Sequence, residues 1–313
     1  MTNPHLAPSM PTPVTLLSRD GYPLAAQLWL PSDEARGSVI ISSATGVLAR
    51  YYARYADFLR GQGYSVLTYD YRGIGGSRPA SLRGMHVRWR DWGDQDFDAA
   101  VRWMRQRDPD GLLVAVGHSI GGFLPGFAAS GTEVDRFLSV GAQYAYWRDY
   151  APEQRWQMFA KWHLFMPLAT ALCGYFPGRR LGWLEDLPAC VAREWAFRKA
   201  RLEHSYPDHE RDEVLRRFAA IRAPILAISL SDDEYATQQA IARGLGYYCN
   251  SRREHVRLTP SALGTAAVGH FALFREQYRE CFWQATLGWI ASGVNPWVPG
   301  EVMLPAAAVD ERD

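Results

Sequence analysis

The sequence has few cysteines and little net charge, two features that often indicate the class of a protein. Its 313 residues include four cysteines, which are far apart and form no C-x-x-C pair: Cys173, Cys190, Cys249 and Cys281. This spacing argues against a zinc site and favours free thiols in a reducing compartment. The formal net charge is only +1, so nothing indicates nucleic acid as a partner. We therefore expect a cytoplasmic protein that binds a small molecule, with no metal or cofactor.

Targeting signals and uninterrupted apolar runs are also scarce. The first 13 residues are proline-rich and lack a basic n-region and an apolar h-region, so we expect no signal peptide there. The longest apolar stretch, residues 112–129, contains His118, Ser119 and several glycines. It is better explained as a strand followed by a turn than as a membrane span. We expect no integral membrane segment, and a homodimer stays open.

The most informative stretch is the G-x-S-x-G motif at Gly117–Gly121, with Ser119 at its centre. An apolar run at residues 112–116 precedes it, and a small-residue segment at 123–130 follows. This order predicts a strand, a sharp turn and a helix, the setting in which such a serine is an exposed nucleophile. The backbone N–H of Ile120 would then point at one side of an oxyanion.

An acid and a base follow in the chain order that this kind of turn requires. The apolar run 223–230 ends in carboxylates, including Asp232 and Asp233, and another strand at 255–260 precedes His270. Carboxyl ends of parallel strands carry the working residues of α/β sheets. We therefore expect Ser119, one of the two aspartates and His270 to meet. One aspartate of the pair would instead cap the following helix.

These pieces together resemble the α/β-hydrolase superfamily over residues 14–292. The strand at 39–43 and the pattern D-x-R-G-x-G-x-S at 70–77 match it as well. The nearest subgroup comprises predicted hydrolases described as serine aminopeptidase-like or monoglyceride-lipase-like. The resemblance implies Ser119 as nucleophile, His270 as base and Asp233 as acid. Asp233 is preferred because Thr237 follows four residues on, with Asp232 as the alternative.

The chain departs from this family at the loop after the 39–43 strand. The usual His-Gly pair is replaced by Ser43-Ala44, followed by Thr45-Gly46. The first oxyanion donor would be the N–H of Ala44 or of Thr45, and the sequence leaves both open. A similar loop occurs in homoserine acyltransferases, so acyl transfer also stays open.

The order of elements predicts an α/β fold with a mostly parallel sheet and helices on both faces. A hairpin is expected at 14–32, strands at 36–43, 64–70, 112–118 and 136–142, and helices at 51–61, 92–105 and 274–290. Asp94, Asp96 and Asp98 fall at the start of the second helix, where negative charge is favourable. We expect a flexible N-terminus (1–13), a core (14–142 and 219–292), a helical lid (143–218) and a C-terminal extension (293–313).

The predicted lid is unusually aromatic, since 14 of the 41 aromatic residues lie between residues 144 and 206. Such side chains either roof the site over Ser119 or fill the small core that a helical cap needs. The predicted substrate-binding residues are Tyr144, Trp147, Trp156 and Trp162.

The sequence therefore predicts a serine hydrolase that cleaves a carboxylic ester with an apolar acyl or alcohol part through an acyl-enzyme. The alternatives are an acyltransferase or small-substrate peptidase with the same triad, and a non-catalytic binding protein on this fold. A peptidase would need a carboxylate near the site to hold an ammonium group. The candidates in the lid are Glu153, Glu185, Asp186 and Glu194.

Overall fold

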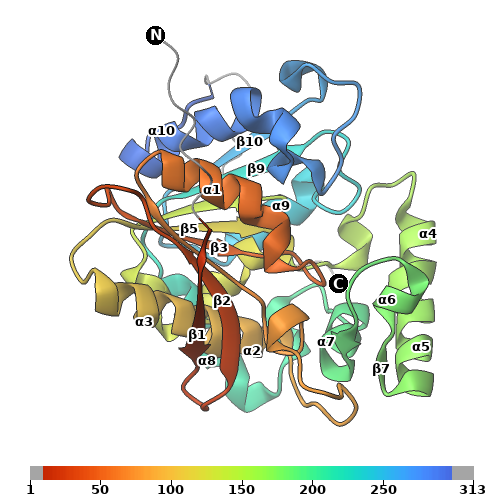
Figure 1. Cartoon of the computed structure of the whole chain (residues 1–313). Coiled ribbons are helices and arrows are strands. Elements are labelled where there is room, and N and C mark those ends of the chain that lie inside the picture. Colours follow the sequence, from red (N-terminus) through yellow and green to blue (C-terminus); the bar gives the residue numbers. More distant parts are fainter. Residues whose placement is uncertain (1–9, 298–313) are drawn as a thin grey trace.

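A computed structural model describes residues 10–297, which are built around one eight-stranded sheet (Figure 1). The strand order is β1-β2-β4-β3-β5-β6-β9-β10. The bounds are Thr12–Leu17 (β1), Pro23–Trp29 (β2), Ser38–Ser42 (β3), Ser65–Tyr69 (β4), Leu113–His118 (β5), Arg136–Val140 (β6), Ile225–Leu230 (β9) and Arg253–Leu258 (β10). β2 pairs antiparallel with both β1 and β4, and every other pair is parallel. The predicted hairpin and mostly parallel sheet are confirmed.

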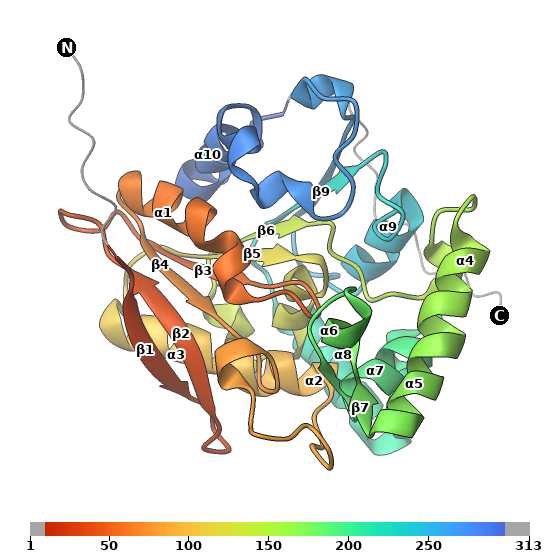
Figure 2. The same ribbon diagram turned by 45° about the vertical axis from the view of Figure 1, so that its right-hand side comes forward.

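Helices cover both faces of this sheet (Figures 1 and 2). α1 (Ala53–Gly61) and α10 (Gln284–Ser292) lie over one face, and α3 (Asp98–Arg107) and α8 (Asp208–Ala220) lie under the other. β3 follows the period of two that a strand imposes on its side chains. Val39 and Ile41 belong to the apolar cluster that includes α1 and α10, and Ile40 to the cluster that includes α3 and α8. The sheet is therefore buried on both sides, as parallel sheets usually are.

The parallel register brings the carboxyl ends of the central strands to one edge. Ser42 of β3 pairs with Gly117 of β5, and His118 pairs with Val140 of β6. Val140 in turn pairs with Ile228 of β9, whose neighbour β10 ends in the same direction. The loops after β3, β5, β9 and β10, which carry the predicted site residues, are thereby neighbours.

The segment after the motif differs from the regular helix that we predicted. Residues 119–133 form three short 3₁₀ turns, at Ser119–Gly122, Leu124–Phe127 and Ala129–Glu133. Pro125 removes a backbone donor, and the glycines in this stretch favour helix weakly. Ala128 between two of the turns is extended (φ −77°, ψ 134°), which interrupts the helix. The predicted helices near 92–105 and 274–290 each contain a π-helical stretch, at Trp92–Phe97 and Arg279–Trp283.

A largely helical segment interrupts the sheet between β6 and β9 and lies beyond its carboxyl edge (Figure 2). It contains α4 (Arg155–Phe159), α5 (Met166–Cys173), α6 (Gly178–Leu181), α7 (Ala189–Ala196) and a small hairpin of β7 (Tyr175–Phe176) with β8 (Leu187–Pro188). A π-helical stretch, Ala160–Phe165, joins α4 to α5. The remaining helices are α2 (Trp89–Asp91) and α9 (Gln238–Gly246). The predicted tails lie mostly outside the described residues, although β1 begins at Thr12. Between residues 10 and 297 no helix is both long enough and apolar enough to cross a bilayer.

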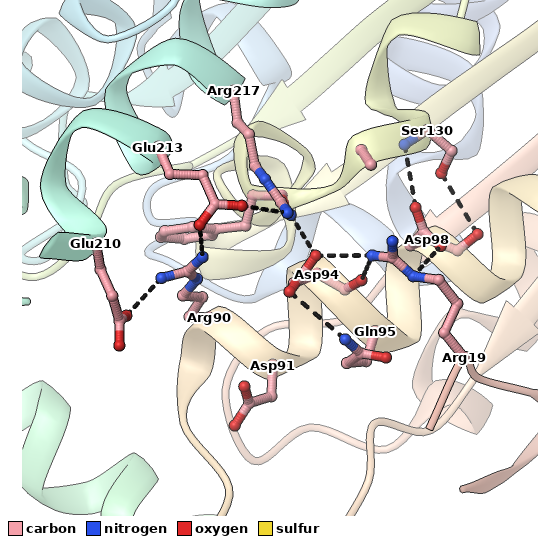
Figure 3. A network of polar contacts seen from close by, with 12 residues as sticks. Arg19, Arg90, Asp91, Asp94, Gln95, Asp98, Ser130, Glu210, Glu213 and Arg217 are labelled. Carbon is pink, nitrogen blue, oxygen red and sulfur yellow. Dashed lines mark hydrogen bonds and ion pairs between the residues drawn. The ribbon is translucent and has the colours of Figure 1, made fainter. Parts of the chain in front are cut away.

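A network of ion pairs joins α8 to the segment that precedes α3 (Figure 3). Arg217 bonds both Asp94 and, at 2.6 Å, Glu213, which also accepts from Arg90 at 3.0 Å. Arg19 in the first hairpin reaches Asp94 at 2.8 Å. Asp94 therefore serves an arginine cluster and not only a helix N-terminus, which corrects the expectation from its position.

Replacing Arg217 tests this network. In Arg217→Met, Asp94 loses one of its partners in a partly buried setting. We expect the free energy of unfolding to fall by about 1–2 kcal/mol, a loss between those typical of exposed and of buried ion pairs. Arg216→Met is the matched control, because Arg216 is exposed and its guanidinium bonds only the Asp212 carbonyl of its own helix. Chemical denaturation of both variants measures the difference, and equal losses would exclude a stabilising role for the network.

Candidate active site

Ser119 lies at the end of β5 in a backbone conformation that side chains seldom adopt. Its φ is +55°, and Ala145 is the other non-glycine residue with a positive φ in the described chain. The turn packs against β3 so closely that a Cβ on Gly121 would lie 2.4 Å from the Ser42 carbonyl oxygen. Only glycine fits there. Such strain, held by close packing, is typical of a functional position.

His270 and Asp233 form a buried pair beside this turn. Nδ1 of His270 lies 2.7 Å from Oδ2 of Asp233, and the side chains are only 3% and 2% exposed. The other carboxylate oxygen accepts the N–H groups of Tyr235 and Ala236 at 2.8 and 2.9 Å. Burial alone would raise the pKa of Asp233. The charge and hydrogen bond of His270, together with the two N–H groups, outweigh burial and lower that pKa.

Asp232 has a different position. Its carboxylate accepts the backbone N–H groups of Val268 and Gly269 at 2.7 and 3.0 Å and does not bond the imidazole. It therefore fixes the loop that carries His270. Neither aspartate caps α9, since the N-cap is Thr237, whose hydroxyl accepts from Ala240 N–H. Of the two aspartates left open by the sequence, Asp233 is the one at the imidazole.

A buried chain of hydrogen bonds connects the loop after β3 to the loop that carries His270. The Ala44 N–H donates to the Tyr52 hydroxyl at 3.0 Å, and that hydroxyl lies 2.7 Å from His118 Nδ1. His118 Nε2 lies 2.9 Å from the carbonyl oxygen of His270. Burial first, and the nearby His270 second, lower the pKa of His118 to about 3. His118 is thus neutral, donates from Nε2 to the carbonyl and accepts the Tyr52 proton at Nδ1.

These hydrogen bonds distinguish the Ala44 N–H from the Thr45 N–H, the two candidate oxyanion donors that the sequence left open. The Ala44 N–H points at Tyr52 and is already bonded. The N–H groups of Thr45 and Ile120 have no hydrogen-bond partner in the described part of the chain. Both residues also line the cavity described next.

A cavity of about 940 Å³ opens at this edge of the sheet, and both Ser119 and His270 line it. Of the remaining predicted residues, Ala44, Thr45, Ile120 and Trp162 line it too. Its aromatic wall comes from Trp89, Trp162, Trp183 and Trp195. Each ring packs against the next. The ring centre of Trp195 lies 5.8 Å from that of Trp89 and 4.5 Å from that of Trp162. The ring centres of Trp162 and Trp183 are 5.6 Å apart.

Three of the four predicted substrate-binding residues lie elsewhere. Tyr144 is 1% exposed, donates its hydroxyl to the Ala200 carbonyl and stacks on Phe123. Trp156 is 70% exposed on α4 and packs against Trp147 on the outer side of the segment. None of the three lines the cavity, so their prediction as pocket residues is corrected. The helical period indicates which side chains share a face but not which face meets Ser119.

The sequence reasoning missed several lining residues, among them Trp89, Glu234 and Tyr235. Glu234 and Tyr235 follow Asp233 directly, and that adjacency was a usable signal. Tyr235 lies 5.0 Å from the His270 ring and accepts the Trp162 indole N–H at 3.2 Å. Trp89 comes from a distant part of the chain, and no local pattern marks it.

The family model for serine aminopeptidases (S33) matches residues 33–169. A soluble variant of monoglyceride lipase from Saccharomyces cerevisiae superposes with a TM-score of 0.65 at 14% identity, covering 93% of this chain and 98% of that one. An esterase from Pyrococcus furiosus gives a TM-score of 0.60 at 17% identity, covering 94% and 96%. An α/β hydrolase from Penicillium sp. sh18 gives 0.59 at 17% identity, covering 90% and 97%. No curated protein matches the chain.

The chain therefore has the α/β-hydrolase fold. At these identities the superposed structures establish the fold of the chain and leave its activity and substrate undetermined.

Removing the Tyr52 hydroxyl tests the buried chain of hydrogen bonds. Tyr52→Phe leaves the Ala44 N–H and His118 Nδ1 without partners, and a buried unsatisfied group costs about 1–3 kcal/mol. We expect a loss of stability of that size in thermal or chemical unfolding. Fluorophosphonate labelling at Ser119 should also slow, because the loops on either side of the serine lose their connection.

Tyr55→Phe is the matched control for that experiment. Tyr55 lies three residues further on, in α1, and is as fully buried as Tyr52, which precedes that helix. It bonds Thr286 on α10 and does not line the cavity. It should lose stability without slowing the labelling. Equal labelling rates in the two variants would contradict a link between Tyr52 and the site.

Proposed function

We propose that this protein is a serine hydrolase that cleaves carboxylic esters with an apolar acyl or alcohol part. The observation that carries the proposal is the buried Asp233–His270 pair, at 2.7 Å, on the same cavity as the strained Ser119. A wall of indoles suits an apolar group bound beside the serine. The esterase and the monoglyceride lipase among the superposed proteins are consistent with this chemistry.

In the proposed mechanism, His270 takes the proton of the Ser119 hydroxyl as the serine attacks the ester carbonyl. Asp233 holds the proton on Nδ1 of the imidazole and stabilises the imidazolium that forms. The imidazolium then protonates the leaving alcohol, which departs and leaves an acyl-enzyme. Water, deprotonated by His270, attacks the acyl-enzyme and releases the acid.

The oxyanion of each tetrahedral intermediate would bind the N–H groups of Thr45 and Ile120. Both are free of protein partners in the described chain, whereas the Ala44 N–H is taken by Tyr52. Two fixed donors aimed at the developing charge usually stabilise it strongly, each by about 2.7–4 kcal/mol.

The segment between β6 and β9 would act as a lid over this site. It contributes Trp162, Trp183 and Trp195 to the cavity wall, and the core contributes Ser119 and His270. This division agrees with the predicted boundary at residue 143, whereas residue 218 falls inside α8 (Asp208–Ala220), whose Val214 and Phe218 belong to the core cluster. The cytoplasmic location and the homodimer stay predictions from the sequence.

A peptidase that removes small N-terminal residues is the second candidate. Two observations favour it: the match to a serine aminopeptidase family model, and the carboxylates of Glu185 and Glu234 on the cavity wall. The other lid carboxylates named above do not line the cavity, and Asp186 pairs with Arg78. Hydrolysis of aminoacyl amides faster than of esters would select this candidate.

The first test is the hydrolysis of p-nitrophenyl esters from acetyl to dodecanoyl. We expect an optimum at a chain length that fits the cavity, and a fall in kcat of about 10⁴-fold or more in Ser119→Ala. Initial rates of the wild type and of Ser119→Ala, measured on each ester, test both expectations. Turnover that survives the substitution at full rate would exclude Ser119 as the nucleophile.

The two aspartates offer a second, internally controlled test. Asp233→Asn should lower kcat by about 10³- to 10⁴-fold, because an amide no longer holds the imidazole in the productive tautomer. Asp232→Asn should stay within about tenfold of the wild type, since its amide oxygen still accepts the Val268 and Gly269 N–H groups. The reverse order of effects would make Asp232 the acid.

A further inference from the structure

Lysine is rare in this chain, and one of the few lysines lines the cavity. Of the 34 lysines and arginines, only Lys161 and Lys199 are lysines. Lys199 is exposed on the surface, whereas Lys161 lies on the same cavity wall as Trp162 and Trp183. Lys161 belongs to the π-helical stretch Ala160–Phe165. Such stretches change the direction of side chains and are frequent at functional sites.

The ammonium group of Lys161 is held by aromatic rings. Its Nζ lies 4.4 Å from the ring centre of Trp162 and 4.2 Å from that of Trp183. Between residues 10 and 297 no carboxylate lies within 4.0 Å of it, and its side chain makes no hydrogen bond. Partial burial lowers its pKa, and the attraction of Glu234 only partly opposes that effect. Trp162 and Trp183 hold the ammonium group at the cavity wall, where its three N–H donors have no acceptor among the described residues.

The other charged lining residues leave the cavity positive. Arg50 and Arg275 are exposed at the wall and form no ion pair with the described residues. The Glu185 carboxylate lies 3.8 Å from Arg179, outside the lining, and is partly neutralised by it. Glu234 is the one unpaired carboxylate among the lining residues. Three unpaired cations against one carboxylate favour an anionic ligand.

We propose that the substrate of this site carries a carboxylate that binds Lys161 Nζ, while its apolar part packs along the tryptophan wall. The inference rests on the proposed esterase function and narrows its substrate to esters with a free acidic group. A carboxylate supplies the charge-assisted acceptor that Nζ lacks. Trp162 and Trp183 already restrict the Lys161 side chain before a ligand binds. Binding therefore costs less conformational entropy than it would at a freely moving lysine.

The test measures binding without turnover, in full-length protein carrying Ser119→Ala. The probes are the monomethyl esters of straight-chain dicarboxylic acids from four to ten carbons, each with its neutral dimethyl ester. At the best length, we expect the monomethyl ester to bind about tenfold or more tightly than the dimethyl ester, as one charge-assisted hydrogen bond implies. Titration calorimetry gives both dissociation constants.

Variants assign the preference to one residue. Adding Lys161→Met should remove the preference, so that the monomethyl and dimethyl esters bind about equally, and Lys161→Arg should restore much of the preference. Lys199→Met is the matched control and should change neither constant. A thermal unfolding curve for each variant separates loss of binding from loss of folding.

Two kinds of result would overturn the proposal. One is equal binding of acid and neutral ester at every length, or a preference that survives Lys161→Met. The other is tighter binding of a methyl ω-aminoalkanoate that Glu234→Gln abolishes, which would indicate an ammonium site instead. Neither result depends on catalysis, so a failure here is distinct from a failure of the ester hydrolysis test at Ser119.

Discussion

The close packing of the turn after β5 against the end of β3 is the constraint on which the site depends. Gly121 meets the carbonyl oxygens of Ser42 and Ser43 so closely that no side chain fits between them. This contact holds Ser119 in its strained conformation and keeps the Thr45 backbone at the same cavity. The 3₁₀ turns that follow are irregular, and packing rather than a long helix maintains the geometry. The stability of the two strands thus offsets the strain at the serine.

The predictable parts of the molecule are those specified by local pattern. The apolar runs before Ser119 and Asp233 predicted the strands and the edge at which both residues lie, since parallel strands end together. Chain order predicted that one of the two aspartates would meet His270, and Asp233 lies 2.7 Å from the imidazole. The choice of Asp233 over Asp232 rested on family resemblance, and the hydrogen bonds of Asp232 supply its physical basis.

What the sequence could not predict depends on contacts between distant residues. Periodicity placed Trp156 on a helix but could not tell that it faces outward, because either face of a short helix satisfies the pattern. Trp89, which precedes α3, and Lys161, in the segment between β6 and β9, line one cavity although they lie far apart in the sequence. No local pattern marks Tyr52, because its hydroxyl meets His118 and the Ala44 N–H only in the folded protein.

The segment between β6 and β9 is attached to the core at both ends. Near its start, Asp149 pairs with Arg243 of α9 through two contacts of 2.5 and 3.1 Å. At its end, α8 pairs with the segment before α3, since Glu210 and Glu213 bind Arg90 and Arg217 binds Asp94 (Figure 3). Because both ends of the segment are held by ion pairs, a movement of the proposed lid would be concentrated in α4 to α7. Such a movement would carry Trp162, Trp183 and Trp195 away from Ser119 and leave both sets of ion pairs in place.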